Sequence, residues 1–238
     1  MLHLSFPNES ADYRAARNAL LDAEIQLRRQ IEAVAAQRRA LPPGGEVPTD
    51  YMFERIGANL MPEKVALSAL FGEHPSILLY SFMYGPDREQ PCPGCTHMLD
   101  AINGSALHAS QRMPIYIVAR SPIARLVAWA QQRGWNQLVL LSAADNDYVA
   151  DYHGNTAGMS REMRAERGYK DGQHWDEPIF NVFRRDGATV RHFWGSELTY
   201  APEDPGQHHR TGDLVDPLWG LLDMSPEGRG DFFPKLDY

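Results

Sequence analysis

The chain contains two cysteines, and both lie in one short motif, Cys92-Pro93-Gly94-Cys95. Two thiols separated by two residues can close into a disulfide and reopen, which makes the pair more suited to chemistry than to packing. Such a pair exchanges electrons when a thiolate attacks a disulfide sulfur and forms a mixed disulfide. The spacing therefore predicts dithiol–disulfide chemistry at Cys92 and Cys95.

The segments around the motif predict which thiol reacts first. Residues 77–84 form an apolar run typical of a buried strand, residues 85–87 interrupt it, and apolar residues at helical spacing follow the motif. Pro93 suits the first helical turn, which places Cys92 at the N-cap. The partial positive charge there favours a thiolate and lowers its pKa to around 7 or below. We expect Cys92 to attack and the more buried Cys95 to resolve.

Alternating strands and helices would position this motif. The pattern predicts strands at 51–56, 77–84, 115–119 and 138–141, a helical turn or loop at 67–71, and a helix with Ser121 as N-cap and Pro122 as first residue that ends at Gly134. This order favours parallel strands joined by crossover helices. Two further strands, 179–184 and 189–194, flank an Asp-Gly turn and predict a hairpin.

Three other segments have less regular patterns. Residues 145–176 are polar and long for a connection, so they form a functional loop or contain short helices. Residues 201–210 are expected to form a loop and 214–224 a last helix. Residues 9–40 predict one long helix, with a narrow stripe at Leu20, Leu27, Ile31 and Val34. That stripe either packs on its own chain or forms a dimerising arm.

The predicted organisation is thus an N-terminal helical extension, residues 1–45, and an α/β domain with a helical tail, residues 46–238. Glu177-Pro178 stands immediately before the hairpin. A Cys-x-x-Cys beside a βαβ pattern is typical of a thioredoxin-like site, in which a cis proline opens the next strand beside the dithiol. We therefore predict a cis bond before Pro178, and Pro178, Glu177, Pro93 and Gly94 as substrate-binding residues. The alternative is a trans proline that begins an edge strand.

Composition limits the compartment and the partners. The 23 basic and 31 acidic residues give a net charge of -8, which argues against a nucleic-acid or anionic-membrane surface. No secretory signal or membrane span is visible, and two cysteines are too few for a secreted disulfide framework, so we expect a cytoplasmic protein. We expect no cofactor. We also expect no metal site, because Cys92, Cys95 and His97 could supply three ligands but the sequence offers no fourth ligand for zinc. The expected partners are a protein or small-molecule disulfide and a thiol reductant.

Several motifs together resemble one known family. They are Arg38-Arg39-Ala40-Leu41-Pro42, Tyr51-Met52-Phe53-Glu54, Phe82-Met83-Tyr84-Gly85-Pro86-Asp87, the dithiol, and Leu222-Asp223-Met224-Ser225-Pro226-Glu227-Gly228-Arg229-Gly230. Over most of its length the chain resembles the thioredoxin-like family of domain of unknown function 899, whose members are described as predicted dithiol–disulfide oxidoreductases. The resemblance implies a thioredoxin-like fold, in its peroxiredoxin-like variant, with a retained dithiol. It implies little about the substrate.

A second resemblance leaves an alternative function open. Pro93-Gly94-Cys95-Thr96 is similar to the motif around the peroxidatic cysteine of peroxiredoxins, which would give Cys95 the leading role. That family has a Thr or Ser three residues earlier, where this chain has Cys92, and an Arg before a later strand, near which this chain has Glu177-Pro178. The alternatives to a dithiol oxidoreductase are therefore a peroxidase that uses Cys95, or a binding protein with incidental cysteines.

Overall fold

We describe a computed structural model that covers residues 4–170 and 174–237. The chain divides between Pro43 and Gly44 into two compact units. The first contains helix α1, Ala11–Arg39, which Ser10 caps by accepting a hydrogen bond from the Tyr13 N–H, at 3.1 Å. The expectation of one long helix is confirmed. No residue of α1 is buried, and whether its apolar stripe joins two copies of the chain stays a prediction.

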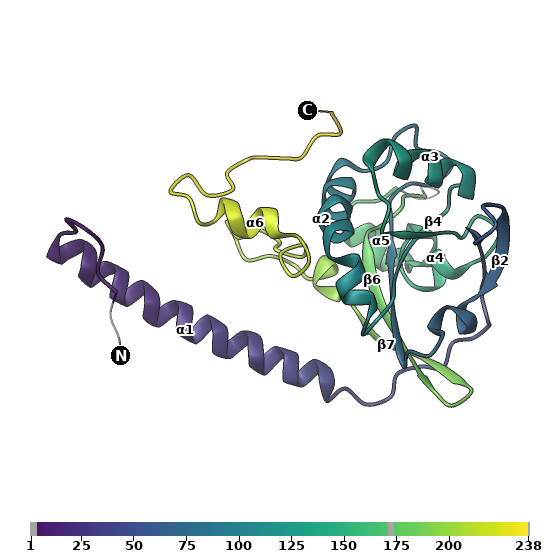
Figure 1. Cartoon of the computed structure of the whole chain (residues 1–238), viewed down its shortest axis with the longest axis horizontal. Coiled ribbons are helices and arrows are strands. Elements are labelled where there is room, and N and C mark those ends of the chain that lie inside the picture. The colour runs from purple at the N-terminus through teal and green to yellow at the C-terminus, as the bar shows by residue number, and fades with distance from the viewer. Residues whose placement is uncertain (1–3, 171–173, 238) are drawn as a thin grey trace. The chain divides into compact units, whose positions relative to one another are not determined.

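The second unit contains a seven-stranded sheet in the order β2-β1-β5-β4-β3-β6-β7. Figure 1 shows this unit, with helices lying around the sheet. Strands β3, β4 and β5 are parallel to one another, whereas β6 pairs antiparallel with β3 and with β7. The strand bounds are β1 Met52–Ile56, β2 Pro62–Ala66, β3 Ser76–Ser81, β4 Ile115–Ala119, β5 Val139–Ser142, β6 Ile179–Asp186 and β7 Thr189–Gly195. The predicted strands and the hairpin are confirmed, and β2 is a strand that the sequence pattern missed.

Helices connect the strands and form part of the C-terminal region. Their bounds are η1 Leu67–Phe71, α2 Pro93–Ser110, α3 Ile123–Arg133, α4 Tyr148–Asp151, η2 Thr156–Gly158, α5 Arg161–Glu166, η3 Glu197–Tyr200 and α6 Pro217–Leu222. The long polar segment thus contains short helices. Helix α3 begins one residue later than predicted, with Pro122 at the N-cap, and ends as expected at Gly134 in the left-handed conformation. Among the described residues, none of the helices has both the length and the apolar character needed to cross a bilayer.

The strand order places the dithiol at the centre of the sheet. Strands β3 and β4 are parallel and joined by α2, and the antiparallel β6–β7 hairpin lies on the other side of β3. This arrangement is thioredoxin-like, as the sequence predicted, with β5, β1 and β2 extending the sheet beyond β4. Because α2 follows β3 directly, its N-terminus lies at the carboxyl end of a central strand, where ligands of α/β sheets bind.

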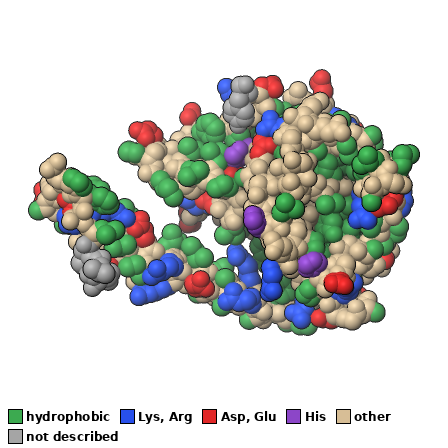
Figure 2. Space-filling model, viewed as in Figure 1, with side chains coloured by type: hydrophobic (Ala, Val, Ile, Leu, Met, Phe, Trp, Pro, Cys, Tyr) green, Lys and Arg blue, Asp and Glu red, His purple; other side chains and the backbone are tan. Residues whose placement is uncertain are grey.

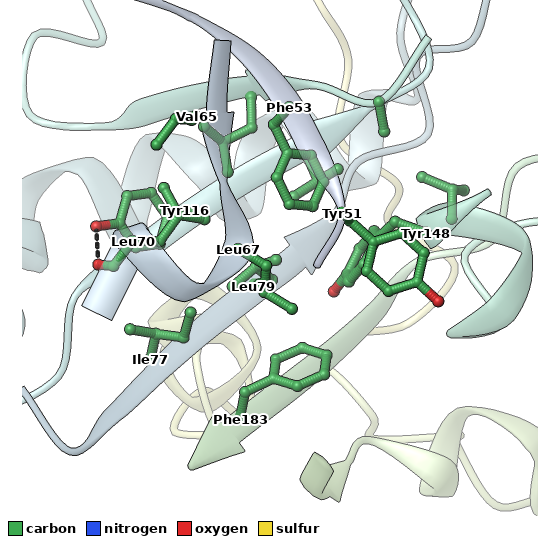
Figure 3. Close-up of a cluster of buried hydrophobic side chains, with 14 of the residues drawn as sticks. Tyr51, Phe53, Val65, Leu67, Leu70, Ile77, Leu79, Tyr116, Tyr148 and Phe183 are labelled. Atoms are coloured by element: carbon green, nitrogen blue, oxygen red, sulfur yellow. Dashed lines mark hydrogen bonds between the residues drawn. The ribbon is translucent and has the colours of Figure 1, made fainter. Parts of the chain in front are cut away.

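Each face of the sheet has its own hydrophobic cluster, because successive side chains of a strand point to opposite faces. On one face, Leu79 packs with Phe53, Tyr148 and Phe183, while the Tyr116 hydroxyl donates to the Leu70 carbonyl at 2.6 Å (Figure 3). On the other face, Tyr80 packs with residues of α2 and α3. The alternation along β3 therefore directs Tyr80 toward the helix that begins at the dithiol.

Candidate functional site

Cys92 occupies the N-cap of α2, as the sequence predicted. Its backbone is extended, its sulfur accepts a hydrogen bond from the Cys95 N–H at 3.5 Å, and Pro93 is the first helical residue. The Cys92 N–H donates to the Met83 carbonyl at 3.2 Å, which ties the start of the helix to the segment after β3. The local sequence therefore presents the Cys92 sulfur to the unpaired N–H groups of a helix end.

The surroundings of Cys92 favour its thiolate. A hydrogen bond from the Cys95 thiol, together with the backbone N–H groups of Cys95 and Gly94 and the charge of Arg88, lowers the pKa of Cys92 to about 6, against the opposing effect of burial. The two thiols are not bonded to one another, and Cys92 keeps partial solvent access. At neutral pH this geometry gives a nucleophile that is mostly ionised.

Cys95 has the opposite environment. It is buried, and three effects raise its pKa well above the ordinary value: its thiol donates to Cys92, burial penalises its charged form, and the Cys92 charge repels a second one. Two polar groups act against this rise and lower the pKa of Cys95, the Tyr80 hydroxyl and the Met83 N–H. Cys95 is therefore a protonated hydrogen-bond donor while Cys92 is a thiolate.

A cation on α3 holds the loop that leads into the motif. Arg125 donates to the carbonyls of Gly85 and Glu89, at 3.2 and 2.9 Å, and also to that of Arg88. Its guanidinium lies 4.3 Å from the Tyr84 ring centroid, a cation–π distance. These contacts fix the backbone of Arg88, whose charge helps to lower the pKa of Cys92.

A buried ion pair joins this loop to the strand that carries Pro178. Asp176 is 4% exposed and accepts from Arg120 Nε at 2.8 Å and from the Gly85 N–H at 2.7 Å. The approach is so close that a Cβ on Gly85 would lie 2.7 Å from both side chains, which explains the glycine. The loop before the dithiol and the segment before β6 are thereby held together.

The prediction of a cis bond before Pro178 is wrong, because the described residues contain no cis peptide. Residues 175–177 run as a short extended segment against residues 154–156, with Glu177 N–H donating to Gly154 O and Thr156 N–H donating to Trp175 O, both at 2.9 Å. A trans bond, the default for X-Pro, continues that extended path directly into β6.

The predicted substrate-binding residues separate into two groups. Pro178 and Gly94 line a pocket of about 190 Å³ that opens at Cys92. Pro93 lies beside it in the first turn of α2 and is not among the lining residues. Glu177 is buried elsewhere, where it accepts from the Tyr169 hydroxyl and pairs with Arg167 at 3.7 Å. The structure thus brings Pro178 and Gly94, but not Glu177, to the dithiol.

Most of the pocket is made by residues that sequence reasoning did not select. Its walls include the apolar side chains of Met83, Met98, Phe180, Trp219 and Phe233. Met83, Met98 and Phe180 stand in a predicted strand or helix, where the sequence indicated only a role in packing. The other two, Trp219 and Phe233, come from the C-terminal tail. The sequence predicted a helix there, and Asp216-Pro217, an N-cap followed by a first-turn proline, marks its start, but no local signal places these two side chains at the dithiol.

The tail is attached to the redox helix by a side-chain pair. His97 Nε2 lies 3.0 Å from Asp216 Oδ1, and Asp216 also caps α6 by accepting from the Leu218 N–H at 3.1 Å. His97 is therefore turned to the tail rather than to the cysteines. Within the part of the chain that the structure describes, no group of three or more His, Cys, Asp or Glu side chains could hold a metal ion.

Comparison with known proteins gives one match to a family and several to solved structures. The family described as "Bacterial protein of unknown function (DUF899)" matches residues 4–237. No curated protein matches this chain.

The solved structures include peroxidoxin BcpB from Mycobacterium tuberculosis, at 16% identity and a TM-score of 0.44 over 74% of this chain and 94% of that one. They also include the 1-Cys peroxiredoxin of Plasmodium falciparum, at 12% identity and a TM-score of 0.49 over 76% and 99%. Scores and identities this low carry no information about the reaction.

The Asp176–Arg120 pair gives a test of how firmly the site is held. Changing Asp176 to Asn leaves Arg120 without its counter-charge, so we expect the free energy of unfolding to fall by about 3 kcal/mol, at the low end for a buried pair because Arg120 keeps some solvent contact. The control is Asp186→Asn, which breaks an exposed pair with Arg184 and should cost less than about 1 kcal/mol. Urea denaturation measures both. Equal small losses would show that the pair does not fix the loop.

Proposed function

We propose that this chain, which belongs to the DUF899 family of bacterial proteins of unknown function, is a thiol–disulfide oxidoreductase of thioredoxin-like fold. Cys92 is the attacking thiol and Cys95 the resolving thiol. The observation that supports the proposal most strongly is that the two thiols have pKa values shifted in opposite directions. The Cys95 thiol and a helix N-terminus lower the pKa of Cys92 to about 6, while the pKa of Cys95 is raised.

The first step uses Cys92. Its thiolate attacks one sulfur of a substrate disulfide, the substrate S–S bond breaks, and one substrate thiolate leaves and takes a proton from water. Cys92 and the other half of the substrate are now joined in a mixed disulfide. The partly exposed position of Cys92 at the pocket supports this role, because the incoming sulfur must reach it in line with the breaking bond.

The first step prepares the second. Once Cys92 is part of a disulfide it is neutral, and it no longer accepts a strong hydrogen bond from Cys95 or repels its charge. Two of the three effects that raise the pKa of Cys95 are then gone, and the lowering effects of the Tyr80 hydroxyl and the Met83 N–H remain. Cys95 releases its proton, attacks the Cys92 sulfur, and expels the second substrate thiolate. Two electrons have passed to the substrate, and a thiol reductant restores the dithiol.

The peroxidase alternative fits this geometry less well. It needs Cys95 as an ionised, accessible thiolate in the resting protein, whereas Cys95 is 5% exposed and its pKa is raised. A binding protein with incidental cysteines does not require an ionised thiol beside a pocket, so that alternative leaves this feature of the site unexplained.

Serine variants separate the two roles. The reduced protein is mixed with 2,2′-dithiodipyridine, and the released thiopyridone is counted by absorbance. The intact protein should release two equivalents, Cys95→Ser only one because it stops at the mixed disulfide, and Cys92→Ser almost none on the same timescale. Fast release from Cys92→Ser with a silent Cys95→Ser would instead make Cys95 the leading thiol. Rates equal to that of free cysteine for both thiols would contradict an enzymatic role.

Tyr80 gives a test of the second step alone. In Tyr80→Phe the buried hydroxyl that lowers the pKa of Cys95 is gone, so we expect the second thiopyridone to appear about tenfold more slowly, the order of magnitude for losing one polar interaction with a charged group. The first release should not change. The control is Tyr148→Phe, a fully buried tyrosine in the cluster on the opposite face of the sheet. Equal rates for the two variants would remove Tyr80 from the mechanism.

A further inference from the structure

The pocket at Cys92 is small and closed on one side by the C-terminal segment. At about 190 Å³ it is below the roughly 300–1,000 Å³ typical of pockets for drug-sized ligands. Phe233 lies at its mouth, with a ring carbon 3.6 Å from where a Cβ of Gly94 would be. Trp219 of α6 adds a second aromatic wall. Hydrophobic side chains also gather on the visible surface around α6 (Figure 2).

Ionic contacts hold this wall in its folded form. Arg229 is 7% exposed and donates to Asp223 and Asp213, in each case at 2.9 Å, while its guanidinium lies 5.4 Å from the Trp219 ring centroid. The His97–Asp216 pair then joins the segment to α2. A protein substrate would have to displace these contacts to lay a chain beside the dithiol, whereas a small molecule enters without doing so.

The chemistry of the lining gives the character of the ligand. Methionine and aromatic side chains dominate, and the described lining residues include no lysine or arginine. The buried charge at the wall is a carboxylate, Asp216, already engaged by His97. The imidazole of the lining, His209, is exposed, and Arg88, whose charge reaches Cys92, is not among the lining residues. An anionic disulfide such as oxidised glutathione would therefore bring its several carboxylates to a mainly apolar wall that offers them little compensation for lost hydration.

From the proposed oxidoreductase function and this pocket, we infer that the natural substrate is a small, uncharged organic disulfide with an apolar or aromatic body, rather than a protein disulfide. Its body lies between Trp219 and Phe233 on one side and the methionines and Phe180 on the other. That placement directs one sulfur of its S–S bond to Cys92, and the exchange then follows the two steps above, with both substrate sulfurs released as thiols.

The test compares three disulfides with the intact, reduced protein: 2,2′-dithiodipyridine, which is neutral and aromatic, oxidised glutathione, and insulin. Loss of protein thiol is followed in each case, and every rate is divided by the rate of free N-acetylcysteine with the same disulfide at the same pH. This division removes the intrinsic reactivity of each disulfide. We expect the normalised rate for dithiodipyridine to exceed the other two by at least about tenfold, the contribution of one buried aromatic contact.

Two wall variants and a matched control locate the effect. Phe233→Ala and Trp219→Ala should each lower the dithiodipyridine rate by about tenfold and leave the insulin rate equal or higher. Phe232→Ala removes a neighbouring exposed phenylalanine that does not line the pocket, and it should change neither rate. Because Phe233 is 60% exposed, its truncation should leave the fold intact, which circular dichroism checks.

The outcomes distinguish this inference from the function on which it rests. Faster normalised reaction with insulin or glutathione disulfide, or wall variants that behave like Phe232→Ala, would overturn the substrate class and leave the dithiol mechanism standing. Failure of all three disulfides to react faster than with the free thiol would overturn the proposed function itself.

Discussion

The hydrogen bond between the two cysteine side chains is the interaction on which the site depends. While Cys95 donates it, Cys92 is held as a thiolate and Cys95 remains protonated, so one contact sets both pKa values in opposite directions. The same contact cannot survive the first covalent step, because a disulfide sulfur carries no charge to accept it. This hydrogen bond therefore determines that Cys92 reacts first and Cys95 second. The helix N-terminus favours the same order, because it stabilises the Cys92 thiolate.

The remaining structure positions this pair. Alternation along β3 places Tyr80 beneath the sulfurs, and the Asp176–Arg120 pair and Arg125 hold the loop that ends at Cys92. The C-terminal segment provides the other side of the pocket and is joined to the redox helix through His97. Elements from widely separated parts of the sequence thus meet at the carboxyl end of one central strand.

The sequence contained enough information to predict the local structure but not the long-range contacts. A proline after Cys92 and a broken apolar run were sufficient to place Cys92 at an N-cap, and the Asp-Gly turn located the hairpin. The trans bond before Pro178 depends on pairing with residues 154–156, which no local pattern reveals. Glu177 turned out to face Tyr169 and Arg167, and the pocket wall formed by Trp219 and Phe233 comes from a tail with few periodic signals.

The most direct measurement is a pH titration of both thiols by 13C NMR in protein labelled at the cysteine Cβ atoms. We predict that Cys92 titrates with a midpoint of about 6 and that Cys95 stays protonated well above the ordinary thiol range. Titration of Cys95 before Cys92, or of both together near the roughly 8.5 of a free cysteine, would contradict it.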